Sequence, residues 1–349
     1  MALIFSQKTL RILAIGDPHF KKDNQLETDL MITALIKLVI ESKPDIIVVL
    51  GDVLDRFETI KSDPLTRANR FLNQLRDSFT GHLVVLIGNH DRPNNNGEHP
   101  LDEHPFGGFV KVPKMLIVDE VKHLVVNNEL FVFVPYLPCG AFIPALDKYT
   151  VSERSEGTDF KKARLIFAHQ EFAGAKMNAI TSNKGDKWPL EYPLVISGHI
   201  HEYHQPQPNI IYTGTPIQHG FGDRHDHAVM FLDLSGNERS GEITRHRVSL
   251  GLPRKIVVEI RAEDLLDYIP PPNCIVRLKV IGDSRVVNAM LKTEKVKELA
   301  RLVDFKIEES AGAAQPLPGK FTSYTERLRA NVSREPQLVQ QMYLALFPN

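Results

Sequence analysis

Short apolar runs alternate with amphipathic stretches along the first part of the chain. The apolar runs cover Ile12–Gly16, Ile46–Leu50 and Leu83–Ile87. Residues 26–39 and 71–75, which lie between them, carry apolar side chains at helical spacing. This alternation is typical of βαβ units with buried parallel strands. In such sheets, functional groups gather just past the carboxyl ends of the strands.

Further apolar runs predict that the same domain continues to about residue 250. They lie at Leu116–Val118, Leu124–Val126, Leu130–Val134, Leu165–Ala168, Leu194–Ser197, Ile210–Thr213 and Val229–Leu234. The pattern predicts an α/β fold over residues 1–250, in which two packed sheets form a sandwich flanked by helices.

The last hundred residues have a different pattern. Residues 251–310 predict a small α+β domain with strands at Lys255–Ile260 and Cys274–Ile281, a helix at Arg285–Leu302 and a strand at Val303–Glu308. Residues 311–319, rich in Ala, Gly and Pro, predict a linker. For residues 320–349 the pattern predicts a C-terminal helical segment whose apolar helix, Glu335–Phe347, would dock either on a partner or on its own domain.

Composition limits the class of protein. Of 349 residues, 42% are hydrophobic and 24% charged, and the formal net charge of −1 neither favours nor excludes nucleic acid. The two cysteines are too few for a disulfide framework. With no membrane-length apolar stretch and no signal-peptide pattern, we expect a soluble intracellular protein without a membrane partner.

Five motifs follow the apolar runs in order and carry the chemical information. They are Gly16-Asp17-Pro18-His19, Gly51-Asp52-Val53-Leu54-Asp55, Gly88-Asn89-His90-Asp91, Ala168-His169 and Gly198-His199-Ile200-His201. Any one of them alone is commonplace. Together they supply carboxylate, amide and imidazole donors, a mixture that suits Mn²⁺, Fe²⁺ or Zn²⁺ better than Ca²⁺.

The ordered set resembles the calcineurin-like metallophosphoesterase superfamily over roughly residues 11–220. The resemblance implies a two-metal site. Asp17, His19 and His201 would hold the first ion, Asp52 would bridge both, and Asn89, His169 and His199 would hold the second. Two ions about 3.5–4 Å apart can clamp a phosphate and stabilise an in-line displacement.

His90 and Asp55 are the expected catalytic pair. The resemblance makes His90 the group that donates to the phosphate or to the leaving oxygen. A carboxylate three residues after Asp52 lies within reach of such a histidine, and would orient it and favour its protonated form. The alternatives are a structural role for His90 and a helix cap for Asp55. Asp91 is expected to fix the loop rather than to bind metal.

Residues that flank the motifs distinguish between branches of the superfamily. The second motif continues Asp55-Arg56-Phe57 and the third ends in Asp91, whereas protein phosphatases carry Asp-Arg-Gly and Gly-Asn-His-Glu. The second, fourth and fifth motifs, with Tyr212-Thr213-Gly214-Thr215-Pro216 after them, resemble the SbcD-type nuclease subunit of double-strand-break processing complexes and its phage counterpart. The small following domain, residues 251–310, fits the same layout, in which it would cap the nuclease domain and help to bind and position DNA.

That resemblance implies a DNA exonuclease and endonuclease acting in double-strand-break repair and recombination with two metal ions, most simply Mn²⁺. It further implies a homodimer within a heterotetramer that contains a coiled-coil, SbcC-type ATPase. The expected location is the cytoplasm of a prokaryote or of a virus-infected cell, or a nucleus.

Two rival functions stay open. The same dimetal core serves phosphatases and phosphodiesterases on small or protein substrates, and the fold can also act as a scaffold without activity. Several histidines outside the motifs are open as well. His99 and His104 lie either in a DNA-contacting or dimer-contacting loop or in a plain insertion, and His219, His225 and His227 either line a substrate groove or are ordinary surface residues.

Overall fold

The computed structural model describes residues 9–57, 59–94, 102–152, 155, 157–177, 180–236, 241–282, 287, 289–309 and 332. The chain divides into two compact units, Met1–Ile256 with Pro271–Ile275, and Val257–Pro270 with Val276–Asn349. The predicted linker at 311–319, the helix Glu335–Phe347 and His99 lie outside the described residues, as does the rest of 320–349 apart from residue 332.

The first sheet of unit 1 contains the first four strands of the chain, β1 to β4, which are parallel. Its strand order is β14-β13-β1-β2-β3-β4. Strands β1 to β4 run parallel to their neighbours, while β13 is antiparallel to β1 and β14 to β13. The strands are β1 (Leu10–Ile15), β2 (Ile46–Val49), β3 (His82–Leu86), β4 (Met115–Val118), β13 (Val229–Leu234) and β14 (Ile243–Val248).

The second sheet has the order β11-β12-β10-β7-β6-β5. Its central strands β6, β7, β10 and β12 are parallel. The strands are β5 (Lys122–Val126), β6 (Glu129–Val134), β7 (Leu165–His169), β10 (Val195–Gly198), β11 (His204–Gln207) and β12 (Ile210–Tyr212). A separate two-stranded ribbon joins β8 (Lys176–Met177) to β9 (Ile180–Thr181).

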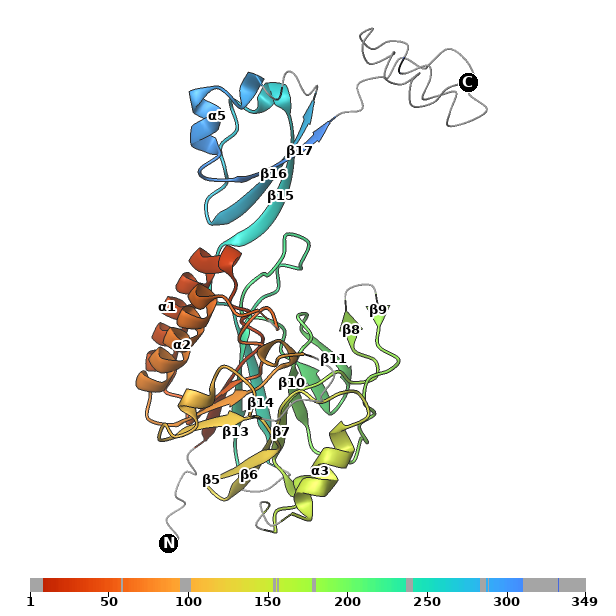
Figure 1. Cartoon of the computed structure of the whole chain (residues 1–349). Coiled ribbons are helices and arrows are strands. Elements are labelled where there is room, and N and C mark those ends of the chain that lie inside the picture. Colours follow the sequence, from red (N-terminus) through yellow and green to blue (C-terminus); the bar gives the residue numbers. More distant parts are fainter. Residues whose placement is uncertain are drawn as a thin grey trace, which may run out of the picture. The chain divides into compact units, whose positions relative to one another are not determined.

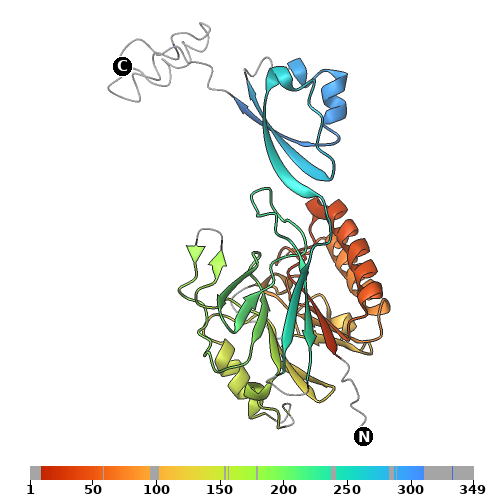
Figure 2. The same ribbon diagram turned by 180° about the vertical axis from the view of Figure 1, so that it is seen from behind.

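Three apolar clusters hold these layers together. Ile12 and Ala14 of β1 belong to the cluster between the sheets, while Leu13 and Ile15 belong to the cluster beneath α1 (Gln25–Ser42) and α2 (Ser62–Asp77). A third cluster packs α3 (Phe142–Thr150) on the outer face of the second sheet. Figures 1 and 2 show these helices on the outside of the two sheets. Strands buried on both faces explain the uninterrupted apolar runs, and the predicted sandwich is confirmed.

Most of the described part of the small α+β domain belongs to unit 2. Its sheet has the order β15-β16-β17, formed by β15 (Arg254–Arg261), β16 (Cys274–Gly282) and β17 (Asp304–Glu309). The prediction of one continuous helix over Arg285–Leu302 is wrong. Thr293 is extended, with φ −72° and ψ 145°, and α5 (Glu294–Leu299) begins only after it.

Short 3₁₀ turns complete the described elements. They are η1 (Lys22–Asn24), η2 (Asn89–Asp91), η3 (Gly107–Phe109), η5 (Phe160–Lys162) and η6 (Ala262–Asp264). Among the helices described here, none is both long enough and apolar enough to cross a membrane.

Candidate metal centre

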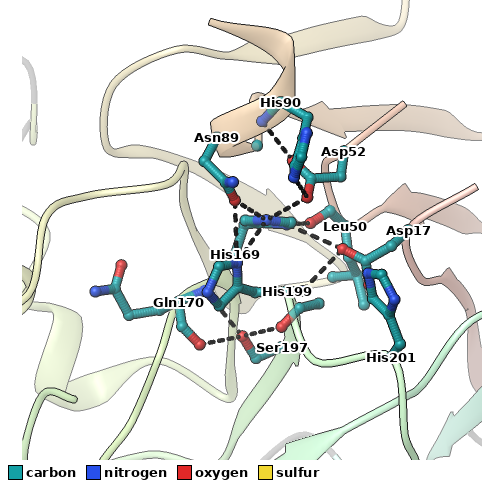
Figure 3. A network of polar contacts seen from close by, with 12 residues as sticks. Asp17, Leu50, Asp52, Asn89, His90, His169, Gln170, Ser197, His199 and His201 are labelled. Carbon is teal, nitrogen blue, oxygen red and sulfur yellow. Dashed lines mark hydrogen bonds and ion pairs between the residues drawn. The ribbon is translucent and has the colours of Figure 1, made fainter. Parts of the chain in front are cut away.

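The polar motif residues converge where parallel strands of both sheets end. Asp17 follows β1, Asp52 follows β2 and Asn89 follows β3, while His169 ends β7 and His199 follows β10. Figure 3 shows these side chains, with His201, turned toward one another. The convergence follows from topology, since parallel neighbours end at one edge of a sheet.

The backbone around this centre adopts unusual conformations. His19, Asp52 and His199 have φ values of 45°, 45° and 77°, a left-handed region that non-glycine residues seldom enter. Strained residues cluster at functional sites because the surrounding packing enforces them. Gly88 is required for space, since a Cβ there would lie 2.2 Å from Oδ1 of Asp52.

One group of donor atoms lies between Asn89, His169 and His199. Oδ1 of Asn89 is 3.1 Å from Nε2 of His169 and 3.0 Å from Nδ1 of His199, and the two ring nitrogens are 3.3 Å apart. Ligands about 2.1 Å from an ion, at right angles to each other, are separated by about 3 Å. The observed spacing therefore fits three ligands of one ion.

The hydrogen bond on the far side of His169 supports this reading. Nδ1 of His169 lies 2.7 Å from the Leu50 carbonyl oxygen, which can only accept, so Nδ1 donates. In the neutral ring Nε2 then carries a lone pair, as the Asn89 oxygen does, so a cation between these two atoms would satisfy both. A histidine that donates one ring nitrogen to a carbonyl and turns the other inward is a typical metal ligand.

A second group of donor atoms belongs to Asp17, His19 and His201. The Nε2 atoms of His19 and His201 are 3.1 Å apart. Oδ1 of Asp17 accepts the backbone N–H of His199 at 2.8 Å, while Oδ2 is buried and has no hydrogen-bond partner. A buried carboxylate oxygen without a donor is costly unless a cation meets it. This group also fits an ion.

Asp52 lies between the two groups. Its Oδ2 atom is 3.3 Å from Nε2 of His169 and 3.6 Å from Nε2 of His19. Its Oδ1 atom accepts the backbone N–H of His90 at 2.9 Å, which fixes the carboxylate. The candidate ligands therefore include one shared carboxylate, which is an economical way to hold two ions close together.

The two buried carboxylates favour positive charge at His169. Burial lowers the pKa of His169, but Asp52 and then Asp17 outweigh it and raise the pKa to about 9. Burial raises the pKa of Asp17, and burial with the charge of His169 lowers the pKa of His199 to about 3. Divalent ions would take the place of the proton on His169.

Asp55 and His90 are placed differently from the expected pair. Oδ1 of Asp55 lies 3.6 Å from Nδ1 of His19 and 3.6 Å from Nζ of Lys21. Within the described part of the chain, no contact between Asp55 and His90 is found. The left-handed turn at His19 brings that ring to Asp55, so the carboxylate supports a candidate ligand. His90 stands at the edge, with its side chain 30% exposed.

Asp91 ties the motif loops together, as expected. Its carboxylate accepts the backbone N–H groups of Val53, Leu54 and Gly88 at 3.2, 2.9 and 3.0 Å. Burial, with the nearby charge of Asp52, raises its pKa to about 7.

The remaining histidines separate into distinct environments. His104 is buried against Asp119, with Nε2 3.6 Å from Oδ2, and His227 bonds Thr215 through Nδ1 at 2.9 Å. His225 is exposed. Sequence reasoning did not place His219 at the metal centre, but the structure groups it with His19 and His201. Its only signal was its position just beyond the Gly-Thr-Pro turn.

Comparison with known proteins assigns the class. Residues 10–203 match the model of the calcineurin-like phosphoesterase family. Because that match covers more than half of the chain, the protein belongs to this family. It is a metallophosphoesterase with candidate ligands for two metal ions.

Two viral proteins are similar over most of the chain. "Putative phosphoesterase 078R" of Invertebrate iridescent virus 3 is 36% identical over 265 residues, 76% of this chain and 73% of that protein. "Putative phosphoesterase 244L" of Invertebrate iridescent virus 6 is 34% identical over 271 residues, 78% of this chain and 93% of that protein.

A solved dimetal phosphatase from Danio rerio has a TM-score of 0.42 and 11% identity, and the match covers 69% of this chain and 96% of that one.

The arrangement is suited to phosphoester hydrolysis. Two bound ions would offset the negative charge of the phosphate. They would also lower the pKa of a nearby water, so that it loses a proton and becomes a nucleophile. Asp17, Asp52 and the imidazoles would hold them, and Asp91 would keep the loops in place. His90, exposed at the rim, can donate a hydrogen bond to a phosphate oxygen or a proton to the leaving oxygen.

Proposed function

We propose that this metallophosphoesterase is a DNA nuclease of the SbcD type that uses Mn²⁺. Water would attack the phosphorus of a backbone phosphodiester in line, forming one P–O bond while the bond to the sugar oxygen breaks. His90 would protonate that oxygen as it leaves. The motif resemblance from Asp17 to Pro216 supports this assignment.

The observation that carries the proposal is a basic cavity beside the metal centre. The charged residues of its lining are Lys21, Lys22, Arg56 and Lys61, together with Asp23 and Asp55. Asp55 also contacts His19, so the cavity and the centre share this residue. The cations outnumber the carboxylates in this lining, and several cations suit a chain of phosphates better than a single small phosphate.

The test is a cleavage assay with Mn²⁺ on end-labelled duplex and hairpin DNA, run beside a small chromogenic phosphodiester. Arg56→Glu should lower DNA cleavage about tenfold more than hydrolysis of the small diester, and should reduce the salt dependence of DNA binding by about one phosphate contact. Lys148→Glu, an exposed lysine of α3 that does not line the cavity, is the matched control.

The outcomes separate the rival enzymes. Hydrolysis of the small diester with no cutting of either DNA, alone or with an ATPase partner, would favour a small-substrate phosphodiesterase or phosphatase. Equal loss of both activities in Arg56→Glu would contradict the proposal that the basic cavity binds DNA.

We further propose a homodimer that assembles with a coiled-coil ATPase, as the SbcD resemblance implies. Sedimentation would test the first part, because a chain of 39.4 kDa should run at twice that mass. Truncation before residue 320 would test the second part, since it should abolish capture of the ATPase without changing metal content.

A further inference from the structure

His219 lies against the group of candidate ligands formed by Asp17, His19 and His201. The segment that carries it follows β12 and the Gly214-Thr215-Pro216 turn. The ring centroid of His219 is 4.8 Å from that of His19 and 5.1 Å from that of His201. One ring nitrogen of each of these three histidines lies within 4.8 Å of the others.

The hydrogen bonding of His219 matches that of a metal ligand. Its Nε2 atom lies 2.9 Å from the backbone carbonyl oxygen of Asp17, and because a carbonyl only accepts, Nε2 carries the hydrogen. Nδ1 of the neutral ring then holds a lone pair, and this atom is buried without a hydrogen-bond partner. His169 shows the same division of roles, donating to Leu50 and keeping its other nitrogen for the centre.

The backbone around His219 is fixed from several sides. The N–H groups of His219 and Gly220 donate to Oδ2 of Asp223 at 3.0 and 2.7 Å, and Nζ of Lys255 donates to the His219 carbonyl at 3.2 Å. Gln218 exchanges two hydrogen bonds with the backbone of Lys255. A ring held in this way is already placed for binding, so little ordering free energy is lost when an ion arrives.

We propose that His219 is an additional ligand, through Nδ1, of the ion held by Asp17, His19 and His201. A buried lone pair without a donor costs free energy, and coordination would remove that cost. The extra imidazole makes this position richer in nitrogen than the position between Asn89, His169 and His199. It should therefore favour Co²⁺ and Zn²⁺ over Mn²⁺ and Mg²⁺ more strongly than the other position does.

The first test measures metal binding by the full chain. Metal-free wild type, His219→Ala and His219→Gln are titrated with Mn²⁺ and with Co²⁺ by calorimetry, and His225→Ala serves as the matched histidine control. We expect one of two binding steps to weaken about 10–100-fold in both His219 variants, with the larger loss for Co²⁺. Isotherms that coincide with the wild type would overturn the proposal.

Rescue distinguishes ligation from packing. Added imidazole should restore Co²⁺ affinity to His219→Ala, because it can occupy the vacated position and coordinate the ion. A loss that imidazole does not reverse, accompanied by lower stability of the metal-free protein, would show a packing role and overturn the proposal.

A measurement on the wild-type protein covers the case in which neither variant folds. Nitrogen NMR of histidine-labelled protein loaded with cadmium should show coupling of the metal to His219 as well as to His19 and His201. No coupling to His219 would overturn the proposal. Because every readout is metal binding, the result does not depend on whether DNA is the substrate.

Discussion

At the scale of single residues, His90 and its neighbour Asn89 have separate tasks. Asn89 directs its oxygen to His169 and His199. His90 hydrogen-bonds Asp52 through its backbone N–H, whereas its Nε2 atom is 4.0 Å from Oδ2 of that carboxylate, beyond hydrogen-bond distance. The His90 ring is therefore available to a substrate, while its backbone helps to fix the bridging residue.

His90→Ala should reduce the turnover number for phosphodiester hydrolysis about 10²–10⁴-fold, the usual contribution of a general acid. Metal content should persist, because alanine keeps the backbone N–H that binds Asp52. Steady-state kinetics and elemental analysis of the same samples test this, with His225→Ala as the control. Loss of both metals in His90→Ala would make His90 a ligand-positioning residue instead.

Asp55→Asn probes the carboxylate that lies against His19. A carboxylate behind a ligating histidine raises its basicity and orients it, and its removal commonly costs about 10–100-fold in metal affinity. We expect a loss of this size at one of the two binding steps, measured by titration with Mn²⁺. Unchanged affinity with slower turnover would instead support the pairing of Asp55 with His90.

At the scale of elements, the site depends on sharp exits from parallel strands. Gly88, between β3 and η2, has an ordinary φ of −82°, so only space excludes a side chain there. A Cβ would lie 2.3 Å from the backbone nitrogen of Asp52. The exit from β3 and the exit from β2 are therefore packed directly against each other.

Gly88→Ala should lower the free energy of unfolding by about 1–3 kcal/mol, as overpacking does, and should weaken metal binding because Asp52 is displaced. Urea unfolding and Mn²⁺ titration measure the two effects. Gly222→Ala is the matched control, since a Cβ at Gly222 meets nothing within 4 Å. Equal stability of the two variants would contradict the steric argument.

The segment before β4 is tied to the strand's far end by a charge cluster that should respond to pH. Burial opposes ionisation of Asp119, but the His104 ring, whose Nε2 atom lies 3.6 Å from Oδ2, and the hydrogen bond from Nζ of Lys122 prevail and lower its pKa below the usual value. The lowered pKa stabilises the fold above about pH 4, and this contribution disappears as acid protonates Asp119. Asp119→Asn should therefore be less stable than wild type at pH 6, with the difference closing below pH 4 in urea unfolding.

The sequence predicts an element well when residues close together along the chain determine it, and poorly when distant residues do. Buried parallel strands appear as apolar runs, so β1, β2 and β3 and the polar residues at their ends were predictable. The break at Thr293 was not, because helical spacing of apolar residues continues through it. The contacts of His19 with Asp55 and with His219 join residues brought together only by the folded loops, and spacing along the chain does not record them.

At the scale of the whole of unit 1, the candidate ligands join the two sheets. Asp17, Asp52 and Asn89 come from the ends of strands in the first sheet, whereas His169 and His199 come from the second. Apart from this edge, the sheets meet through an apolar cluster that includes Ile12, Val48 and Phe167. An ion bound at this edge stabilises the sandwich, because the assembled ligand set exists only in the folded state.

Mn²⁺ should therefore raise the thermal midpoint of unit 1. Free Mn²⁺ at about 100 times its Kd adds about 2.7 kcal/mol for each ion, or about 5–10 °C for a domain of this size. Calorimetry of the full chain with Mn²⁺ and with a chelator measures the shift, and Asp52→Asn, which lacks the shared carboxylate, should show much less. A midpoint that does not change with Mn²⁺ in the wild type would mean that the ligands do not hold the two sheets together through bound ions.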